Sequence, residues 1–243
     1  MEDNIAEIVE KAIKEISFAD NKLTLWCDNE RVIVGAMVVD NPRAEKFFSL
    51  SSLYNTIVDA DKKIKYSLKR AADLTDVHDE KGWNPIQPPS ENEWLAIYYA
   101  ENAVFRVEVL WDLLAQIYNL LIDKGFSQDK IYTLRFFHDL QQGKHPDAFA
   151  KRVYEYMTED EDETGETWSG SHKFLKEYRD KLTHRCSPNV TSLNNFATEL
   201  RLPTTLVLYR LVIDYLQVVS FIQELVEKIE TEFEDYLSIN SEE

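Results

Sequence analysis

The amino-acid sequence predicts an all-α protein folded as a helical bundle. Glycine and proline are scarce, at 6 and 7 of 243 residues, which disfavours an all-β or a disordered chain. Charged residues make up 29% of the chain, and many glutamates and lysines recur at helical spacing. The hydrophobic fraction of 44% is enough to bury one large core, or a core with an appendage.

Residues 1–89 are expected to form an N-terminal extension. Apolar residues at helical spacing over residues 3–18 predict one amphipathic helix. Residues 23–39 are rich in β-branched side chains and have a polar break in the middle, which favours a β-hairpin with 32–39 as the more buried strand. A buried helix is the alternative for this segment, because periodicity does not separate short apolar runs.

A long helix is predicted from Asn41-Pro42 to about residue 75. The following residues, 76–90, contain three prolines and a glycine and form the clearest linker of the chain. Ser90 then fits a helix N-cap, with Glu93 three residues later completing a capping box. We therefore place the main boundary of the chain after residue 89.

Residues 90–238 are expected to form the bundle itself. The last helix repeats apolar residues at alternating spacings of three and four, so this seam must pack along another long helix. An antiparallel pair with the first helix of the bundle is the simplest arrangement. The acidic run at residues 159–166 is expected to be a solvated loop. Helices are predicted over residues 91–124, 128–142, 146–158, 171–185 and 204–236. In the first of them the expected core-facing residues are Trp94, Ile97, Tyr98, Phe105, Val109 and Leu113.

The net charge of -17 limits the classes of partner. An acidic chain does not attract phosphates, which argues against non-specific coating of nucleic acid and against docking on an anionic membrane. A small basic site on an acidic body is still compatible with this charge. The two cysteines, Cys27 and Cys186, make no disulfide framework, so a reducing cytoplasm is the expected compartment. Neither a secretory signal peptide nor an apolar window long enough for a membrane span is recognised.

Most motifs of catalysis and cofactor binding are missing from the sequence. There is no glycine-rich phosphate loop, no CxxC pair, no HExxH and no GxSxG. No two of the five histidines are spaced i,i+4 on one helix, so neither a metal nor a cofactor is expected. The aromatic residues that recur along the long helices are interpreted as part of the hydrophobic core and not as a cofactor site.

One stretch, EYRDKLTHRCSP at residues 177–188, carries a chemical pattern. Residues 173–185 contain five basic and two acidic residues, so they form a positive island in an acidic chain. Asp180 and His184 are spaced i,i+4 and so face the same side of a helix, where a carboxylate can fix the tautomer of an imidazole. Arg179 is about 140° from His184 around an ideal helix. Arg, Asp and His are also ordinary residues at the end of a surface helix, so the alternative is that this pattern has no catalytic role.

A guanidinium, an imidazole and an orienting carboxylate are the groups needed for RNA transesterification without a metal. A base removes the proton of the 2′-hydroxyl, which attacks the adjacent phosphorus. A cation stabilises the charge that develops on the phosphorane, and an acid protonates the leaving oxygen. The catalytic candidates are therefore Arg179, Asp180 and His184, with Lys176, Lys181 and Arg185 as the candidates for substrate binding.

The pattern Arg179-Asp180-x-x-x-His184, near the end of a helix that precedes a long terminal helix, resembles the Arg-polar-x(3)-His signature of the HEPN superfamily. The resemblance covers roughly residues 90–238 and leaves residues 1–89 as an extension. It implies an up-and-down bundle of four or five helices that forms a homodimer. Asp stands here in a polar position that is often Asn. His184 is followed by Arg185 and Cys186, not by the His-x-Tyr of the subgroup that a nucleotidyltransferase neutralises.

The resemblance also implies a function. Arg179 would bind the scissile phosphate, His184 would act as general acid and base, and Asp180 would orient the imidazole. The expected protein is a metal-independent endoribonuclease that cuts RNA as a homodimer. Such proteins serve as toxins or in antiviral defence, which implies an antitoxin or other regulatory protein as a partner. The alternatives are a non-catalytic HEPN-like module that binds a nucleotide or a protein, and a helical scaffold in which the motif has arisen by chance.

Overall fold

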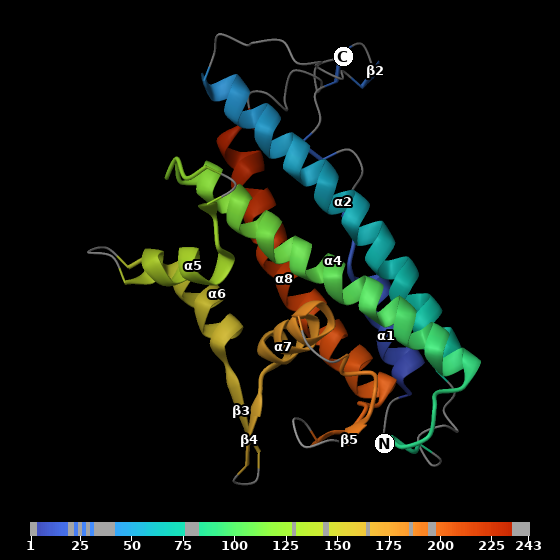
Figure 1. The fold of residues 1–243 in the computed structure, drawn as a ribbon. Helices are drawn as coiled ribbons and strands as arrows, with labels where there is room; N and C mark the ends of the chain where they lie inside the picture. Colours follow the sequence, from blue (N-terminus) through green and yellow to red (C-terminus); the bar gives the residue numbers. More distant parts are fainter. Residues whose placement is uncertain are drawn as a thin grey trace.

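The computed structural model of the chain confirms the all-α class. It describes residues 4–18, 22–23, 26–27, 30–31, 42–75, 83–127, 130–142, 146–163, 166–184, 187–193 and 198–234. In this part of the chain there are seven α-helices and three short antiparallel strand pairs (Figure 1). The helices are α1 (Ile5–Glu15), α2 (Pro42–Leu74), α4 (Glu91–Leu121), α5 (Thr133–Gln141), α6 (Ala148–Thr158), α7 (Ser171–His184) and α8 (Thr204–Glu232). The strands are β1 (Trp26–Cys27), β2 (Glu30–Arg31), β3 (Asp160–Glu163), β4 (Glu166–Ser169), β5 (Ser192–Leu193) and β6 (Thr198–Glu199).

Three long helices, α2, α4 and α8, form the body of the molecule (Figure 1). Lys46, near the start of α2, donates to the carbonyl of Leu121 at the end of α4, so these two helices are antiparallel. Lys46 also pairs with Glu232 at the end of α8, at 2.9 Å. At the opposite end Arg201, just before α8, pairs with Glu93 in the first turn of α4.

The predicted antiparallel pairing of α4 with α8 is therefore wrong, because both helices begin at the same end of the bundle. The prediction used only their matching lengths, and length does not determine direction. The chain between them returns through α5, α6 and α7 before α8 begins (Figure 1).

One hydrophobic core joins the helices of both parts of the chain. Among its largest fully buried side chains, Tyr54 lies on α2, Trp111 on α4 and Tyr215 on α8. The predicted seam of α8 is buried from Val212 to Phe233. Residues 1–89 thus share their core with the bundle, and the division at residue 89 stays a prediction about organisation.

The prediction for α4 is only partly correct. Its expected core-facing residues Ile97 and Leu113 are buried. Four others are exposed and form a stripe on the outer face of the helix: Trp94, Tyr98, Phe105 and Val109. The inner faces of α4 are instead lined by alanine and aliphatic residues, which allow α2 and α8 to approach closely on two sides.

The sequence analysis recognised no apolar window long enough for a membrane span, but helix α8 is long and apolar enough by length and composition, the one such helix among the described residues, with a mean hydropathy of 1.6 in its best window. More than half of that window, 56%, is buried inside the protein. The core helix of a water-soluble bundle meets the same two criteria, so its length and composition do not assign a membrane location.

The β-hairpin expected at residues 23–39 is confirmed around its turn. Trp26 pairs with Arg31 and Cys27 with Glu30, while residues 32–39 lie outside the described part of the chain. The loop predicted at 159–166 is wrong for most of its described residues. Residues 160–163 and 166 lie in the β3–β4 hairpin, which projects from the body beside α7 (Figure 1).

Helix boundaries follow their caps. Ser90 accepts a hydrogen bond from the backbone of Glu93 at 3.2 Å, which confirms the predicted N-cap of α4. Helix α5 begins at Thr133, five residues later than the predicted start at 128. The hydroxyl of Thr133 donates to Asp112 of α4 at 2.6 Å, so a contact with another helix marks the start of α5.

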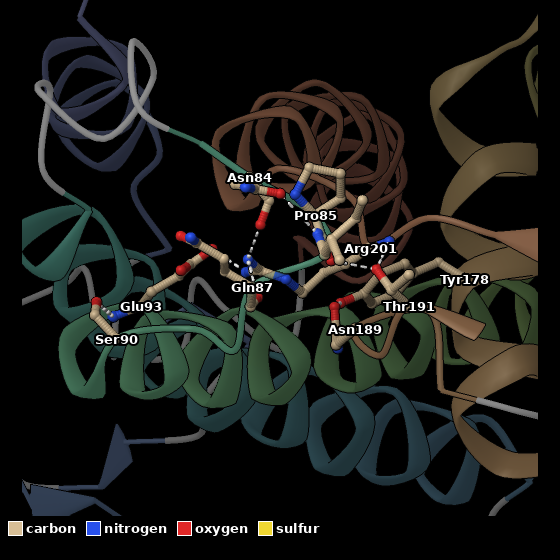
Figure 2. A network of polar contacts seen from close by, with 10 residues as sticks. Asn84, Pro85, Gln87, Ser90, Glu93, Tyr178, Asn189, Thr191 and Arg201 are labelled. Atoms are coloured by element: carbon tan, nitrogen blue, oxygen red, sulfur yellow. Dashed lines mark hydrogen bonds and ion pairs between the residues drawn. The ribbon is translucent and has the colours of Figure 1, made fainter. Parts of the chain in front are cut away.

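A network of polar contacts ties the linker before α4 to the segment before α8 (Figure 2). Arg201 is only 3% exposed, and it pairs with Glu93 and donates to the carbonyl of Asn84 at 3.2 Å. The Thr191 hydroxyl accepts from the backbone of Arg201 and donates to the carbonyl of Pro85. The sequence predicted a linker here, and the described half of it, residues 83–90, is held in place by a buried arginine.

The junction of the β3–β4 hairpin with α7 depends on Gly170. A Cβ atom at this position would lie 2.6 Å from the carbonyl oxygen of Glu159, which also accepts the backbone N–H of Gly170 at 3.0 Å. We expect Gly170→Ala to lower the free energy of unfolding by about 1–3 kcal/mol, because two backbone segments must move apart. Urea denaturation followed by circular dichroism measures the loss. Ser169→Ala is the neighbouring control, and equal stability of both variants would contradict the close approach.

Candidate active site on helix α7

Helix α7 lies with one face against the body of the bundle. Its buried residues are Ser171, His172, Leu175 and Tyr178, which recur at helical spacing. Tyr178 donates its hydroxyl to Asn189 at 2.7 Å, which connects the helix to the segment that follows it. The inner face of α7 is therefore fixed, and the outer face carries the basic residues.

Arg179 lies at the edge of this inner face. Its side chain is 32% exposed, and Nη2 is 3.9 Å from Oε2 of Glu108 on α4 and 3.0 Å from Oδ1 of Asp180. Its Nε atom is buried and has no hydrogen-bond partner among the described residues. The guanidinium is therefore held against α4 by one carboxylate and flanked by a second one, with part of its surface open to solvent.

His184 ends α7 on a different side of the helix. Its side chain is exposed, and it makes no hydrogen bond or ion pair within the described residues. Asp180, which we expected to orient this imidazole, lies against Arg179 instead. The structure thus brings Arg179 and Asp180 together, and within the described residues neither of them forms an ion pair or a hydrogen bond with His184.

The predicted substrate-binding residues differ in their surroundings. Lys181 pairs with Glu199 of β6 at 3.1 Å. Lys176 is partly exposed and has no ion pair in the part of the chain that the structure describes. Arg185 lies outside the described residues.

A buried polar cluster underlies α7. Asp214 of α8 is fully buried and accepts the indole N–H of Trp111 at 3.0 Å. Nδ1 of His172 lies 3.3 Å from the other carboxylate oxygen of Asp214, and the imidazole meets the Trp111 ring at 4.8 Å. One contact set therefore joins α4, α7 and α8.

Our sequence analysis did not select Glu108, Asp214, Trp111 or His172 as site residues. Asp214 does have a recognisable signature, because it is the only acidic residue between positions 204 and 223 of a largely apolar helix. A lone carboxylate on such a helix indicates a buried charge that needs partners. Glu108 has no comparable signature, since α4 carries several acidic residues.

Burial also acts on Glu108. It raises the pKa of this carboxyl above its ordinary value of 4.5, while the charges of His172 and Arg179 act in the opposite direction. The partner of Arg179 is therefore a carboxylate whose charged form is costly in this place. No group of three or more metal-ligating side chains occurs within the described residues.

The arrangement provides three chemical functions: a partly exposed guanidinium, a flanking carboxylate and, separately, an exposed imidazole. The guanidinium can bind one phosphate through its open side. The imidazole stands exposed at the C-terminal end of α7.

Comparison with known proteins adds no family assignment. No protein-family model matches this chain, and no curated protein and no solved structure is significantly similar to it. The resemblance to HEPN domains therefore depends on the α7 motif and its helical context.

We expect Asp214→Ala to lower the free energy of unfolding by about 3–5 kcal/mol, because the buried partners Trp111 and His172 lose their carboxylate. Urea denaturation measures the change. Glu227→Ala removes an exposed carboxylate from the same helix and serves as the control. Equal stability of the two variants would show that the buried cluster does not hold the three helices together.

Glu108→Gln tests the cost of the buried carboxylate. A raised pKa means that the folded state binds more protons than the unfolded state, so stability falls as pH rises from 4.5 through the higher folded-state value. We expect the variant to lose less free energy of unfolding than wild type between pH 4.5 and pH 7, as measured by urea denaturation at a series of pH values. The exposed Glu227→Gln should behave like wild type. If the free energy of unfolding changed with pH in the same way in wild type and Glu108→Gln, the effect of burial on the Glu108 pKa would be contradicted.

Proposed function

We propose that this protein is a metal-independent endoribonuclease of the HEPN type, acting as a homodimer in the cytoplasm. Arg179 binds the scissile phosphate and stabilises the phosphorane, and His184 transfers protons to and from the reacting oxygens. Asp180 contacts Arg179, so in this proposal it orients the guanidinium and does not orient the imidazole. A role as a toxin or defence component, controlled by an antitoxin or other regulatory protein, follows from the same resemblance.

The observation that carries the proposal is the state of Arg179. Its ion pair with Glu108, at 3.9 Å, places the guanidinium beside α4 while a third of the side chain remains open. A cation whose position is set before substrate arrives loses little entropy when it binds a phosphate. The same helix leaves the His184 imidazole free of protein partners within the described residues, so it is available for proton transfer.

In this proposal a second copy of the chain brings an Arg179 and a His184 together. Arg179 and His184 lie about 140° apart around α7, so one chain does not bring both to one phosphate. The exposed stripe on α4, formed by Trp94, Tyr98, Phe105 and Val109, is an apolar surface next to Glu108. We propose that this stripe takes part in the homodimer and brings His184 of one protomer to Arg179 of the other.

A second function is favoured by a different observation. Glu108 and Asp180 together place two carboxylates around one guanidinium, which reduces its attraction for a phosphate. This charge balance favours a non-catalytic HEPN-like module that binds a protein or a nucleotide.

The first experiment is RNA cleavage in excess EDTA by wild type, Arg179→Ala and His184→Ala, with analysis of the product ends. We expect wild type to leave 2′,3′-cyclic phosphate ends. His184→Ala should lose about 10²–10⁴-fold in rate, the contribution of a general acid–base group, and Arg179→Ala about 10²–10³-fold, the contribution of one charge-stabilising donor. Arg70→Ala, an exposed arginine of α2, is the control and should cut like wild type.

Mixing the two inactive variants tests the shared site. If Arg179 of one protomer works with His184 of the other, half of the dimers in an equal mixture are mixed and each has one intact site. About a quarter of wild-type activity should then return. An inert wild type, or variants that cut as well as wild type, would refute the endoribonuclease and leave the binding module as the function.

A further inference from the structure

A groove beside α5 carries a second set of cationic and aromatic side chains. It lies between the end of α4 and α5, and has a volume of about 480 Å³, within the range of roughly 300–1,000 Å³ for small-molecule sites. Its lining includes Lys124, Phe126, Lys130, Tyr132, Arg135 and Phe136. Our sequence analysis assigned no role to these residues.

We propose that this groove binds nucleotide units, with bases stacked on its aromatic rings and phosphates at its lysines. Phe126 is 53% exposed and Tyr132 is 71% exposed, so both rings present a face to a ligand. An aromatic ring offers the same stacking surface to every base. The binding does not depend on the activity proposed for Arg179 and His184.

The cations of the groove are available to an anion. Lys124 and Lys130 are exposed and form no ion pair within the described residues. Arg135 lies 3.7 Å from Asp139 in a pair in which both side chains are largely exposed, and such pairs contribute little. On a chain with a net charge of -17, three cations around one carboxylate form a local positive field.

The exposed aromatic residues are held in place by buried contacts. Asn119 is buried on α4, and its amide donates to the carbonyl of Phe126 at 2.9 Å and accepts the N–H of Phe126 at 3.2 Å. Next to Tyr132, Thr133 is bonded to Asp112 of α4. A stacking surface fixed in this way requires little ordering on binding, which is typical of built sites.

The chemistry of the groove selects among anionic ligands. An acidic peptide would use the cations and leave two large exposed rings without a partner. A nucleotide uses both, because it joins a planar base to a phosphate. The groove and the α7 site both border α4: Thr133, next to the lining residue Tyr132, donates to Asp112, which is one helical turn from Glu108. A single-stranded RNA could therefore contact both, and a free nucleotide could occupy the groove alone.

The test measures binding of a fluorescein-labelled 2′-O-methyl oligouridylate by fluorescence anisotropy, with the full chain in EDTA. This probe has no free 2′-hydroxyl and is not cut, so binding is measured whether or not the protein is a nuclease. We expect Tyr132→Ala and Phe126→Ala each to weaken binding at least about fivefold, while Tyr132→Phe binds like wild type. The double variant Lys124→Ala/Lys130→Ala should reduce the slope of log K against log salt by about 1.4.

Two matched controls accompany these variants. Tyr209→Ala removes an exposed tyrosine of α8, and Lys69→Ala removes an exposed lysine of α2. Both should bind like wild type, and circular dichroism should show native helix content in every variant. Binding that is absent at millimolar protein, or unchanged in the groove variants, would overturn the proposal. The proposal would also be overturned if polyglutamate displaced the labelled probe as well as unlabelled oligonucleotide does and Tyr132→Ala bound the probe like wild type.

Uridine monophosphate as a competitor distinguishes the two sources of the ligand. Displacement by the mononucleotide at a concentration similar to that of the oligonucleotide assigns a free nucleotide, and displacement by the oligonucleotide alone assigns a strand. Either result, with its dependence on Tyr132, upholds the groove as a nucleotide site. A protein inert in the cleavage assay that still binds through Tyr132 would refute the nuclease and uphold the groove.

Discussion

The fully buried carboxylate of Asp214 is the constraint on which the arrangement of α4, α7 and α8 depends. A charged or polar group at this depth requires partners. One carboxylate oxygen accepts the indole N–H of Trp111, and the imidazole of His172 lies 3.3 Å from the other oxygen without forming a hydrogen bond to it. Apolar packing alone permits neighbouring helices to slide or rotate with modest cost. A polar contact in the core permits few alternatives, so it determines how α7 lies on the body.

The position of α7 in turn determines what its charged residues contact. With His172 fixed below the helix, Arg179 comes to the edge that faces Glu108, two helical turns further on. His184 then lies on the free side at the end of the helix. The same docking that fixes the guanidinium therefore separates it from the imidazole within one chain. This separation is the reason why we propose that another copy of the chain completes a site that uses both.

The acidity of the chain makes its positive regions conspicuous. One is the outer face of α7 and the other is the groove at α5. Around Arg179 the positive charge is balanced by Glu108 and Asp180, whereas Lys124 and Lys130 of the groove have no such counter-charges among the described residues. In a chain of this composition the attraction of an anion depends on these local balances, because the total charge repels it.

The sequence by itself determined the helical class, the positions of most helices and the motif on α7. Helical periodicity and caps such as Ser90 depend on residues close together in the chain, so they can be predicted from sequence. Periodicity is clearest where a helix buries only one face. The sequence did not determine that α4 runs parallel to α8 or that Trp94 and Tyr98 are exposed to solvent. Nor did it determine that Asp180 contacts Arg179 instead of His184. A helix such as α4, apolar on several sides, does not reveal which side is covered. The direction of helix packing and the partners of each charge arise from contacts between residues far apart in the chain, and only the tertiary structure decided them.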